Sequence, residues 1–351
     1  MKRPAPRPVE TLIVAIPETA GSALYGMIDV LSASGTLWQS IIRTKPDGAR
    51  FRIRIVSPKR RPFRCGHNIP VVPDVSLADE PAAEVVIVPE IWLGPDETMA
   101  GRYPALMDWL RARHAAGSTL YAACAGTIVL AETGLLDERN ATSHWAYWDM
   151  FRKQYPRVKF RPEPSLVFGD PAGQIVTAGG ATSWHDLALH IISRHAGAAE
   201  ALRIAKAYLL KLHDEGQLAF ANLVRNEPHG DAVVQECQEW LRRRFKQSDA
   251  IAQVIAHARI PERTLKRRFK LATGLTLIEH LQNIRVEHAK RFLEESDLPI
   301  DKVTTEAGYE DASFFRRIFR RSTGLSPAQY RRVFQSLSRG GESTTPHRAS
   351  T

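Results

Sequence analysis

A near-duplication in the last third of the chain constrains its fold most strongly. The stretch TLKRRFKLATGLT, residues 264–276, returns about fifty residues later as FFRRIFRRSTGLS, residues 314–326. Each copy places basic side chains around an apolar i,i+4 pair, the spacing that brings two side chains to one face of a helix. Each copy then reaches Thr-Gly-Leu, where glycine favours the left-handed conformation that ends helices. The repeat therefore predicts two equivalent amphipathic helices.

A shorter helix is predicted before each of these two. Ile251 and Val254 of the first copy match Ile300 and Val303 of the second, at an offset of 49 residues. The offset after the intervening turn is 50, and a turn between two short helices tolerates one extra residue. The pattern therefore predicts two helix-turn-helix units.

These units span residues 249–274 and 300–324. Residues 277–296 between them read as one amphipathic helix, which would span roughly 30 Å. One turn of DNA is about 34 Å long, so the second helix of each unit could enter successive major grooves.

The net charge of +10 is concentrated in the repeat. Residues 1–240 carry 26 basic and 26 acidic side chains, whereas residues 241–335 carry 20 basic and 11 acidic ones. A neutral two-thirds joined to a basic third indicates a C-terminal part that binds a polyanion. The alternative is a pair of solvated helical hairpins whose charge only aids solubility. Two basic copies at the ends of a connecting helix favour DNA binding.

The repeat resembles a known family. LKRRFKLATGLT and, more specifically, AGYEDASFFRRIFRRSTGLSPAQYRR resemble the DNA-binding domain of AraC/XylS transcriptional regulators over residues 241–334. Arg268 departs from the family pattern, because it stands where the second copy has Ile318 and where the family usually has an apolar residue. The resemblance implies DNA contacts from Arg263, Thr264, Lys266, Arg267 and Lys270 of the first copy and from Ser313, Arg316, Arg317 and Arg320 of the second.

The first 200 residues alternate strand-like and helix-like runs. The strand-like runs are short, rich in β-branched residues and closed by glycine or proline: TLIVAIP, FRIRIVSP, AEVVIVPE, STLYAACAG and QIVTAGG. Helical patterns such as PALMDWLRARHAAG lie between them. Near-continuous apolar strands separated by helices predict a doubly wound, mostly parallel, flavodoxin-like sheet that helices cover on both faces.

The pattern becomes all-helical from Asp231, a suitable N-cap residue. We therefore expect an α/β domain followed by an all-α domain. The expected boundaries are 9–212 for the first domain, 213–236 for a linker, 237–335 for the second domain, and 1–8 and 336–351 for disordered tails.

Cys124 lies at a predicted strand-turn-helix junction in TLYAACAGTIVLAETGLL. Such a junction exposes a side chain beside a helix N-terminus, where the helix dipole can lower the pKa of a thiol. The segment resembles the nucleophile elbow of the class I glutamine amidotransferase-like superfamily, which includes the PfpI-type proteases. With AETGLLDERNATSHW it resembles the amidotransferase-like sensor domain of many AraC-type regulators, over about residues 9–200. Glu18 stands where superfamily members often place an acid near the cysteine.

Catalysis by Cys124 is not expected. The protease-like members carry a histidine directly after the nucleophile, where this chain has Ala125. His144, His185 and His190 have no spacing that marks a general base. If the chain were catalytic, Cys124 and Glu18 would be the candidate residues.

A small-molecule pocket is the preferred interpretation of this region. Doubly wound sheets bind ligands at the carboxyl ends of their strands. Tryptophans near those ends could supply an apolar wall, or alternatively belong to the core or to a dimer face. The candidate ligand-binding residues are Glu18, Trp92, Cys124, Ala125, Gly126, His144, Trp145 and Gly180.

The sequence thus predicts a DNA-binding transcriptional regulator controlled by a small-molecule effector bound in the N-terminal domain. The resemblance favours an activator, a homodimer, and promoter DNA and RNA polymerase as partners. A cysteine-dependent amidase or hydrolase with a DNA-binding tether, and an architectural DNA-binding protein, are the alternatives. Three scattered cysteines and the lack of a long apolar run favour a cytoplasmic protein that contacts no membrane. No motif indicates a metal or another cofactor.

Overall fold

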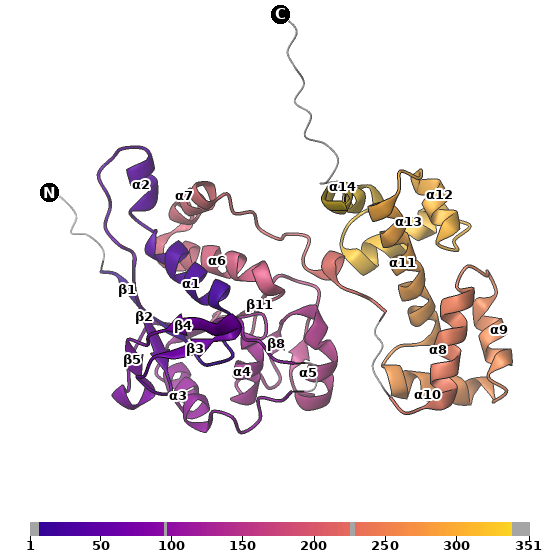
Figure 1. Ribbon diagram of the computed structural model, residues 1–351, viewed down its shortest axis with the longest axis horizontal. Coiled ribbons are helices and arrows are strands. Elements are labelled where there is room, and N and C mark those ends of the chain that lie inside the picture. Colours follow the sequence, from indigo (N-terminus) through magenta and orange to yellow (C-terminus); the bar gives the residue numbers. More distant parts are fainter. Residues whose placement is uncertain (1–6, 95–96, 225–228, 339–351) are drawn as a thin grey trace, which may run out of the picture. The chain divides into compact units, whose positions relative to one another are not determined.

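The chain forms two compact units, Met1–Gln217 and Leu218–Thr351, which are described separately. The computed structural model describes residues 7–94, 97–224 and 229–338 (Figure 1). The expected disordered tails therefore lie mostly outside the described residues. At the C-terminal side, helix α14 runs to Ser338, three residues into the range expected to be disordered.

The first unit is built on a seven-stranded sheet with the strand order β10-β11-β7-β6-β1-β2-β5. Neighbouring strands pair in parallel, except that β10 and β11 are antiparallel. The strands are β1 (Val9–Val14), β2 (Phe51–Ser57), β5 (Val75–Ser76), β6 (Val85–Val88), β7 (Thr119–Ala123), β10 (Leu166–Phe168) and β11 (Ile175–Ala178). The five strand-like runs of the sequence are confirmed as β1, β2, β6, β7 and β11.

Helices cover both faces of the sheet, as predicted. Successive residues of β1 point to opposite faces: Leu12 and Val14 join one core, and Ile13 joins the other. The first core receives α3 (Pro104–Ala115), α4 (Gly126–Glu132) and α5 (Trp148–Gln154). The second receives α1 (Gly21–Ser32), α6 (Trp184–Ala196) and α7 (Ala198–Tyr208), on the opposite side of the sheet in Figure 1.

Smaller elements complete the first unit. A short helix, α2, follows α1, and two two-stranded sheets, β3-β4 and β8-β9, lie outside the main sheet. Their bounds are α2 (Leu37–Ile41), β3 (Phe63–Cys65), β4 (Ile69–Val71), β8 (Asn140–Ala141) and β9 (Lys159–Phe160).

The second unit is all-helical, as predicted. Its helices are α8 (Ala232–Arg244), α9 (Ala250–His257), α10 (Glu262–Thr273), α11 (Leu277–Glu295), α12 (Ile300–Glu306), α13 (Ala312–Thr323) and α14 (Pro327–Ser338). The long helix α11 contributes to two cores. Its first half packs with α8, α9 and α10, and its second half packs with α12, α13 and α14. Figure 1 shows the two helix-turn-helix units near opposite ends of α11.

The two copies of the repeat end in the same way. Gly274 and Gly324 take φ values of 74° and 79°, the left-handed conformation that the sequence predicted for them. Thr273 and Thr323 each donate a hydroxyl hydrogen bond to the carbonyl four residues earlier, at 2.7 and 2.8 Å. The two copies are therefore similar in structure as well as in sequence.

The turns before α10 and α13 share a position with a positive φ but fill it with different residues. Gly308 has a φ of 84°, and the equivalent position in the first copy is Arg259 with a φ of 52°. Arginine rarely adopts this conformation, because its Cβ approaches the backbone too closely.

The expected linker 213–236 differs from the structure at both ends. Helix α8 begins at Ala232, because the Asp231 carboxylate caps it by accepting a hydrogen bond from the Val234 N–H at 3.2 Å. A short 3₁₀ helix at Leu218–Phe220 already belongs to the second unit, where Ala219 is 1% exposed. Apolar residues inside a largely polar segment thus dock it onto the helical core.

Candidate DNA interface and ligand site

The second helix of each repeat buries an apolar pair and exposes its basic side chains. Leu265 and Phe269 of α10, and Phe315 and Phe319 of α13, are fully buried. The predicted DNA-contacting residues of both helices are exposed, except that Thr264 is half-buried. The helices therefore present a cationic face to solvent in each copy.

Four arginines of this face have no carboxylate partner among the described residues. They are Arg263 and Arg267 of α10 and Arg317 and Arg320 of α13. Arg317 lies 5.2 Å from the centre of the Phe314 ring, which orients its guanidinium without neutralising it. Unpaired charged groups on this face, of which Arg267 and Arg317 stand at equivalent positions, are available to phosphates and base edges.

The other predicted cations of the face form weak ion pairs. Lys266 pairs with Glu262 at 2.5 Å, Lys270 with Glu279 at 3.8 Å, and Arg316 with Asp301 at 3.1 Å. All six side chains are exposed, and exposed pairs contribute only about 0–1 kcal/mol. A polyanion can therefore compete for these lysines and for Arg316.

Arg268, the departure from the AraC pattern, has a structural partner instead. Its guanidinium donates two hydrogen bonds to the Asp231 carboxylate, at 2.8 and 2.6 Å. Asp231 also caps α8, and the Arg268 guanidinium holds the pKa of this carboxyl below its usual range. Arg268 thus links α10 to the start of α8.

The strand-turn-helix elbow is present at Cys124. This residue has a φ of 52°, a left-handed conformation that bulky residues seldom adopt. A Cβ on the following Gly126 would lie 2.4 Å from the Pro89 carbonyl oxygen, so only glycine fits where α4 begins. The elbow therefore brings Cys124 and Ala125 close to the end of β6.

The helix dipole, which can lower the pKa of a thiol, does not determine the pKa of Cys124. Cys124 is 2% exposed, and burial raises its pKa well above the ordinary value, with a further increase from the neighbouring Glu90. Backbone N–H groups of Ala125 and His144 oppose this effect only in part. Desolvation outweighs the dipole, because α4 starts inside the core rather than at a solvated cleft.

The acid in contact with the thiol is Glu90. The Cys124 Sγ donates to Glu90 Oε1 at 3.4 Å, and burial raises the pKa of the Glu90 carboxyl. Glu18, the residue that the resemblance placed here, accepts hydrogen bonds from the Tyr103 hydroxyl at 2.7 Å and from Arg102 at 3.1 Å. The sequence signal for Glu90 was its position at the end of the strand-like run AEVVIVPE.

We expect the folded chain to react slowly with a thiol reagent. All three cysteines are buried, and at Cys124 the reactive thiolate is disfavoured near neutral pH. A disulfide-exchange reagent such as 5,5′-dithiobis(2-nitrobenzoic acid) should detect three thiols in denaturant and very little fast reaction without it. Rapid native modification that Cys124→Ser abolishes would contradict this burial.

Three of the predicted ligand-binding residues gather around one buried glutamine. The Gln217 side chain accepts a hydrogen bond from the Trp145 N–H at 3.1 Å, and its Oε1 lies near Gly180. The His144 ring packs on Trp145 with 4.9 Å between ring centres, and burial lowers the pKa of His144. Gln217 was not predicted, because it falls in the segment read as a linker.

The remaining predicted ligand-binding residue, Trp92, lies apart from this group. It is 50% exposed and contacts the His67 ring edge-on, at 5.1 Å between ring centres. Its backbone N–H donates to the Glu18 carbonyl at 2.6 Å, so Trp92 and Glu18 stand together.

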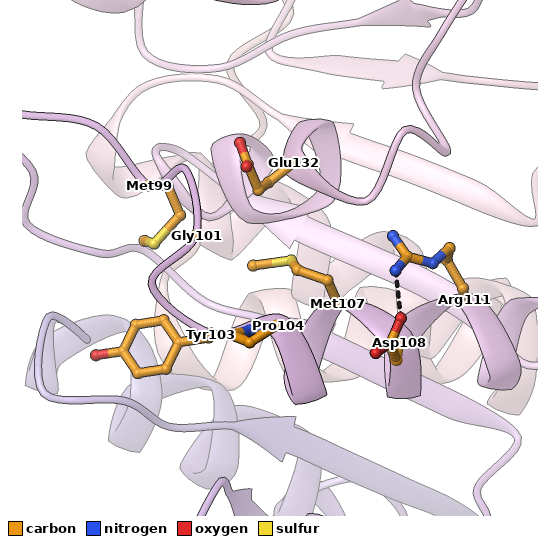
Figure 2. Close-up of a pocket in the computed structure, with 8 residues that line it drawn as sticks. All are labelled: Met99, Gly101, Tyr103, Pro104, Met107, Asp108, Arg111 and Glu132. Atoms are coloured by element: carbon orange, nitrogen blue, oxygen red, sulfur yellow. Dashed lines mark hydrogen bonds and ion pairs between the residues drawn. The ribbon is translucent and has the colours of Figure 1, made fainter.

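A cavity of about 210 Å³ opens beside this second group, next to Tyr103. Figure 2 shows Met107 between Tyr103 and Glu132, and Asp108 paired with Arg111. Another cavity, of about 300 Å³, is lined by side chains of α5 and by Phe160. Neither of these two cavities includes Cys124 or Gly180.

Comparison with known proteins matches both units. The DJ-1/PfpI family model matches residues 23–194, and a helix-turn-helix domain model matches residues 254–333. The chain joins a DJ-1/PfpI-family domain to an AraC-type helix-turn-helix domain. The two matched domains occur in the order that the sequence predicted.

Relatives of this AraC-type chain include named regulators. It is 28% identical over 289 residues to the HTH-type transcriptional regulator CdhR of Pseudomonas aeruginosa, a match that covers 81% of this chain and 82% of CdhR. It is 36% identical over 89 residues to the HTH-type transcriptional activator RhaR of Escherichia coli, covering 25% of this chain and 32% of RhaR. Among solved structures, Drosophila melanogaster DJ-1beta is 20% identical, covers 58% of this chain and 100% of its own, and gives a TM-score of 0.47.

Two kinds of feature are absent from the described residues. Across residues 7–94, 97–224 and 229–338, no helix is both long and apolar enough to cross a bilayer. The same residues contain no cluster of three or more histidine, cysteine, aspartate or glutamate side chains that could hold a metal ion.

Proposed function

We infer that this chain is a DNA-binding transcriptional regulator whose DJ-1/PfpI domain senses a small molecule. The matched cationic faces of α10 and α13 support this inference most directly. The helix between them, α11, has 19 residues and so spans roughly 28 Å. This length is similar to one turn of DNA, which is about 34 Å. A single rigid connection of this length suits two neighbouring major grooves.

The effector is proposed to bind in the first unit, at the carboxyl ends of the parallel strands. It would act by shifting the population of DNA-competent conformations. Activation, a homodimer and contact with RNA polymerase are proposed by analogy with the relatives, of which RhaR is named an activator. Access to promoter DNA also implies residence in the cytoplasm.

We further propose that Cys124 is not a catalytic nucleophile, although the DJ-1/PfpI family includes enzymes. A nucleophile needs an accessible thiolate and a nearby base. The thiol is buried and protonated near neutral pH, and Ala125 stands where a protease-like histidine would be. The nearest ring candidate, His144, uses its Nδ1 to accept the Ala146 N–H at 3.1 Å.

A Cys124→Ala variant tests the sensor against an amidase or hydrolase. Metabolites that raise the melting temperature of the full chain would first be identified, since a ligand stabilises the state it binds. Operator affinity, on a duplex selected from random DNA by the full chain, should then respond to the same metabolite in both proteins. Consumption of the metabolite by the parent chain, lost in Cys124→Ala together with the DNA response, would favour the enzyme.

An architectural DNA-binding protein would behave differently in the same assay. It would bind random and selected duplexes with similar affinity at every salt concentration, because phosphate contacts carry no sequence information. We expect the selected duplex to resist a random-sequence competitor as salt increases.

A further inference from the structure

The boundary between the two units falls between two consecutive residues of the chain. Gln217 is the last residue of the first unit, and Leu218 is the first residue of the second. The side chain of one is fixed in the DJ-1/PfpI domain, and the segment that follows is fixed in the helical domain. Because Gln217 and Leu218 are neighbours in the chain, releasing the Gln217 side chain changes the restraint on Leu218.

The segment after Gln217 is held on α11. The Lys290 ammonium, 6% exposed, donates to the Ala221 carbonyl at 2.5 Å. The Leu223 N–H donates to Glu287 Oε1 at 2.9 Å, and the Leu223 carbonyl accepts from Asn283 at 3.2 Å. These three contacts fall on the middle of the helix that both helix-turn-helix cores share.

Gln217 is held in the first unit by a complete set of hydrogen bonds. Its Nε2 donates to Thr142 Oγ1 at 3.1 Å and to the Ser143 carbonyl at 2.8 Å, while its Oε1 accepts from the Trp145 N–H. Gln217 is 5% exposed. A long polar side chain is rarely buried this deeply, and here every strong hydrogen-bonding atom of its carboxamide is paired.

The carboxamide sits where a ligand of this fold is expected. Ser143 donates its hydroxyl to the Cys124 carbonyl at 2.7 Å, and Gly179 follows the carboxyl end of β11. A Cβ on Gly179 would lie 2.6 Å from Gln217 Nε2, so this glycine leaves the room that the carboxamide fills. Doubly wound sheets bind small molecules at these strand ends.

The cradle formed by Thr142, Ser143 and Trp145 selects a chemical class. It offers one N–H donor and two oxygen acceptors, the complement of a primary carboxamide. A carboxylate would face the Ser143 carbonyl without a hydrogen to donate. An ammonium group would leave the Trp145 N–H unpaired, at a cost of about 1–3 kcal/mol for a buried donor.

We propose that the Gln217 carboxamide is a tethered occupant of the effector site, and that a small molecule carrying a primary carboxamide displaces it. The proposal rests on the sensing function inferred above and names its site and ligand class. Displacement releases the residue next to Leu218 and so removes a restraint on residues 218–223, which contact α11 through Ala221 and Leu223. Residues 218–223 thereby convert occupancy of the cradle into a change in the DNA-binding unit.

Gly179→Ala imitates displacement, because the new methyl group takes the place of the carboxamide. The tip of the Gln217 side chain can rotate away from this methyl group. Gly180→Ala is the matched control, since its methyl group would meet Gln217 Oε1 only at 3.5 Å, an ordinary contact. We expect amide hydrogen exchange across residues 213–223 of the full chain to accelerate at least about tenfold in Gly179→Ala alone. Equal exchange in the two variants would overturn the proposal.

Gln217→Ala tests the ligand class without relying on Gly179. This variant lacks one carboxamide, which acetamide can replace in the emptied cradle. We expect acetamide to raise the melting temperature of Gln217→Ala more than that of the parent chain, and acetate and N,N-dimethylacetamide to have no such selective effect. Equal responses to the three compounds, or no response to acetamide, would overturn the carboxamide assignment.

Neither experiment needs DNA, so failures of the two proposals can be told apart. Normal operator binding with unchanged exchange in Gly179→Ala would remove the tethered-occupant proposal alone. Accelerated exchange and acetamide rescue in a chain that lacks operator preference would remove the regulatory function and keep the cradle.

Discussion

Arg267→Ala and Arg317→Ala are each expected to weaken binding to a selected operator by about 1–3 kcal/mol, roughly fivefold to 150-fold. The two arginines occupy equivalent positions of α10 and α13, and neither has a carboxylate partner among the described residues. No internal ion pair is lost in either variant, so the stability of the helical unit should change little. Fluorescence anisotropy with a labelled duplex measures the loss directly.

The pattern of the loss distinguishes base contacts from phosphate contacts. A base-reading arginine should lose discrimination at one operator position, whereas a phosphate contact should weaken all duplexes alike and reduce the salt slope by about one. Arg52→Ala removes the same charge from β2 of the first unit, where Arg52 pairs with Glu10, and serves as the control. Operator binding at parent strength in both α10 and α13 variants would remove these arginines from the interface.

Gly308→Ala is expected to destabilise the helical unit by about 2–4 kcal/mol, since it adds backbone strain of about 1–3 kcal/mol to a steric clash. Gly308 has a φ of 84°, and a Cβ there would lie 2.9 Å from the Lys246 Cα and 3.1 Å from the Phe245 carbonyl oxygen. Both neighbours are backbone atoms that cannot rotate away. Denaturant unfolding followed by circular dichroism should show a lower midpoint with an unchanged slope.

Arg259→Gly is the reciprocal change in the first copy. Arg259 occupies the equivalent turn position with a φ of 52°, so glycine relieves strain there and should stabilise the unit by up to about 1 kcal/mol. The opposite signs of the two variants would identify backbone conformation as the cause. Destabilisation of similar size in both would point instead to a lost contact of the Arg259 side chain.

Local patterns predicted most of the fold. The long strands β1 and β2 and the glycine-ended helices α10 and α13 are specified by residues close in sequence, and all were predicted. The edge strands β5 and β10 have two and three residues, too few to show an alternation, and were missed. Their existence depends on pairing with β2 and β11 rather than on their own composition.

The candidate DNA interface could be predicted from local sequence patterns, whereas the candidate ligand site depends on contacts between residues far apart in the chain. The basic faces of α10 and α13 follow from helical spacing, so their residues could be listed in advance. Gln217 could not, because Trp145 and Thr142 lie 72 and 75 residues away from it in the chain. The protonation of Cys124 also depends on burial by distant elements, which outweighs the local effect of the elbow.

A helix that belongs to two cores limits how this chain can evolve. One residue inserted near the middle of α11 would rotate everything beyond it by about 100° and advance it by about 1.5 Å. The second helix-turn-helix would then point to a different side of the molecule, and the core against α14 would lose its register. The spacing between neighbouring binding motifs on a genome can change by single base pairs. The length of α11 can change only by whole helical turns if both helix-turn-helix units are to keep their orientation.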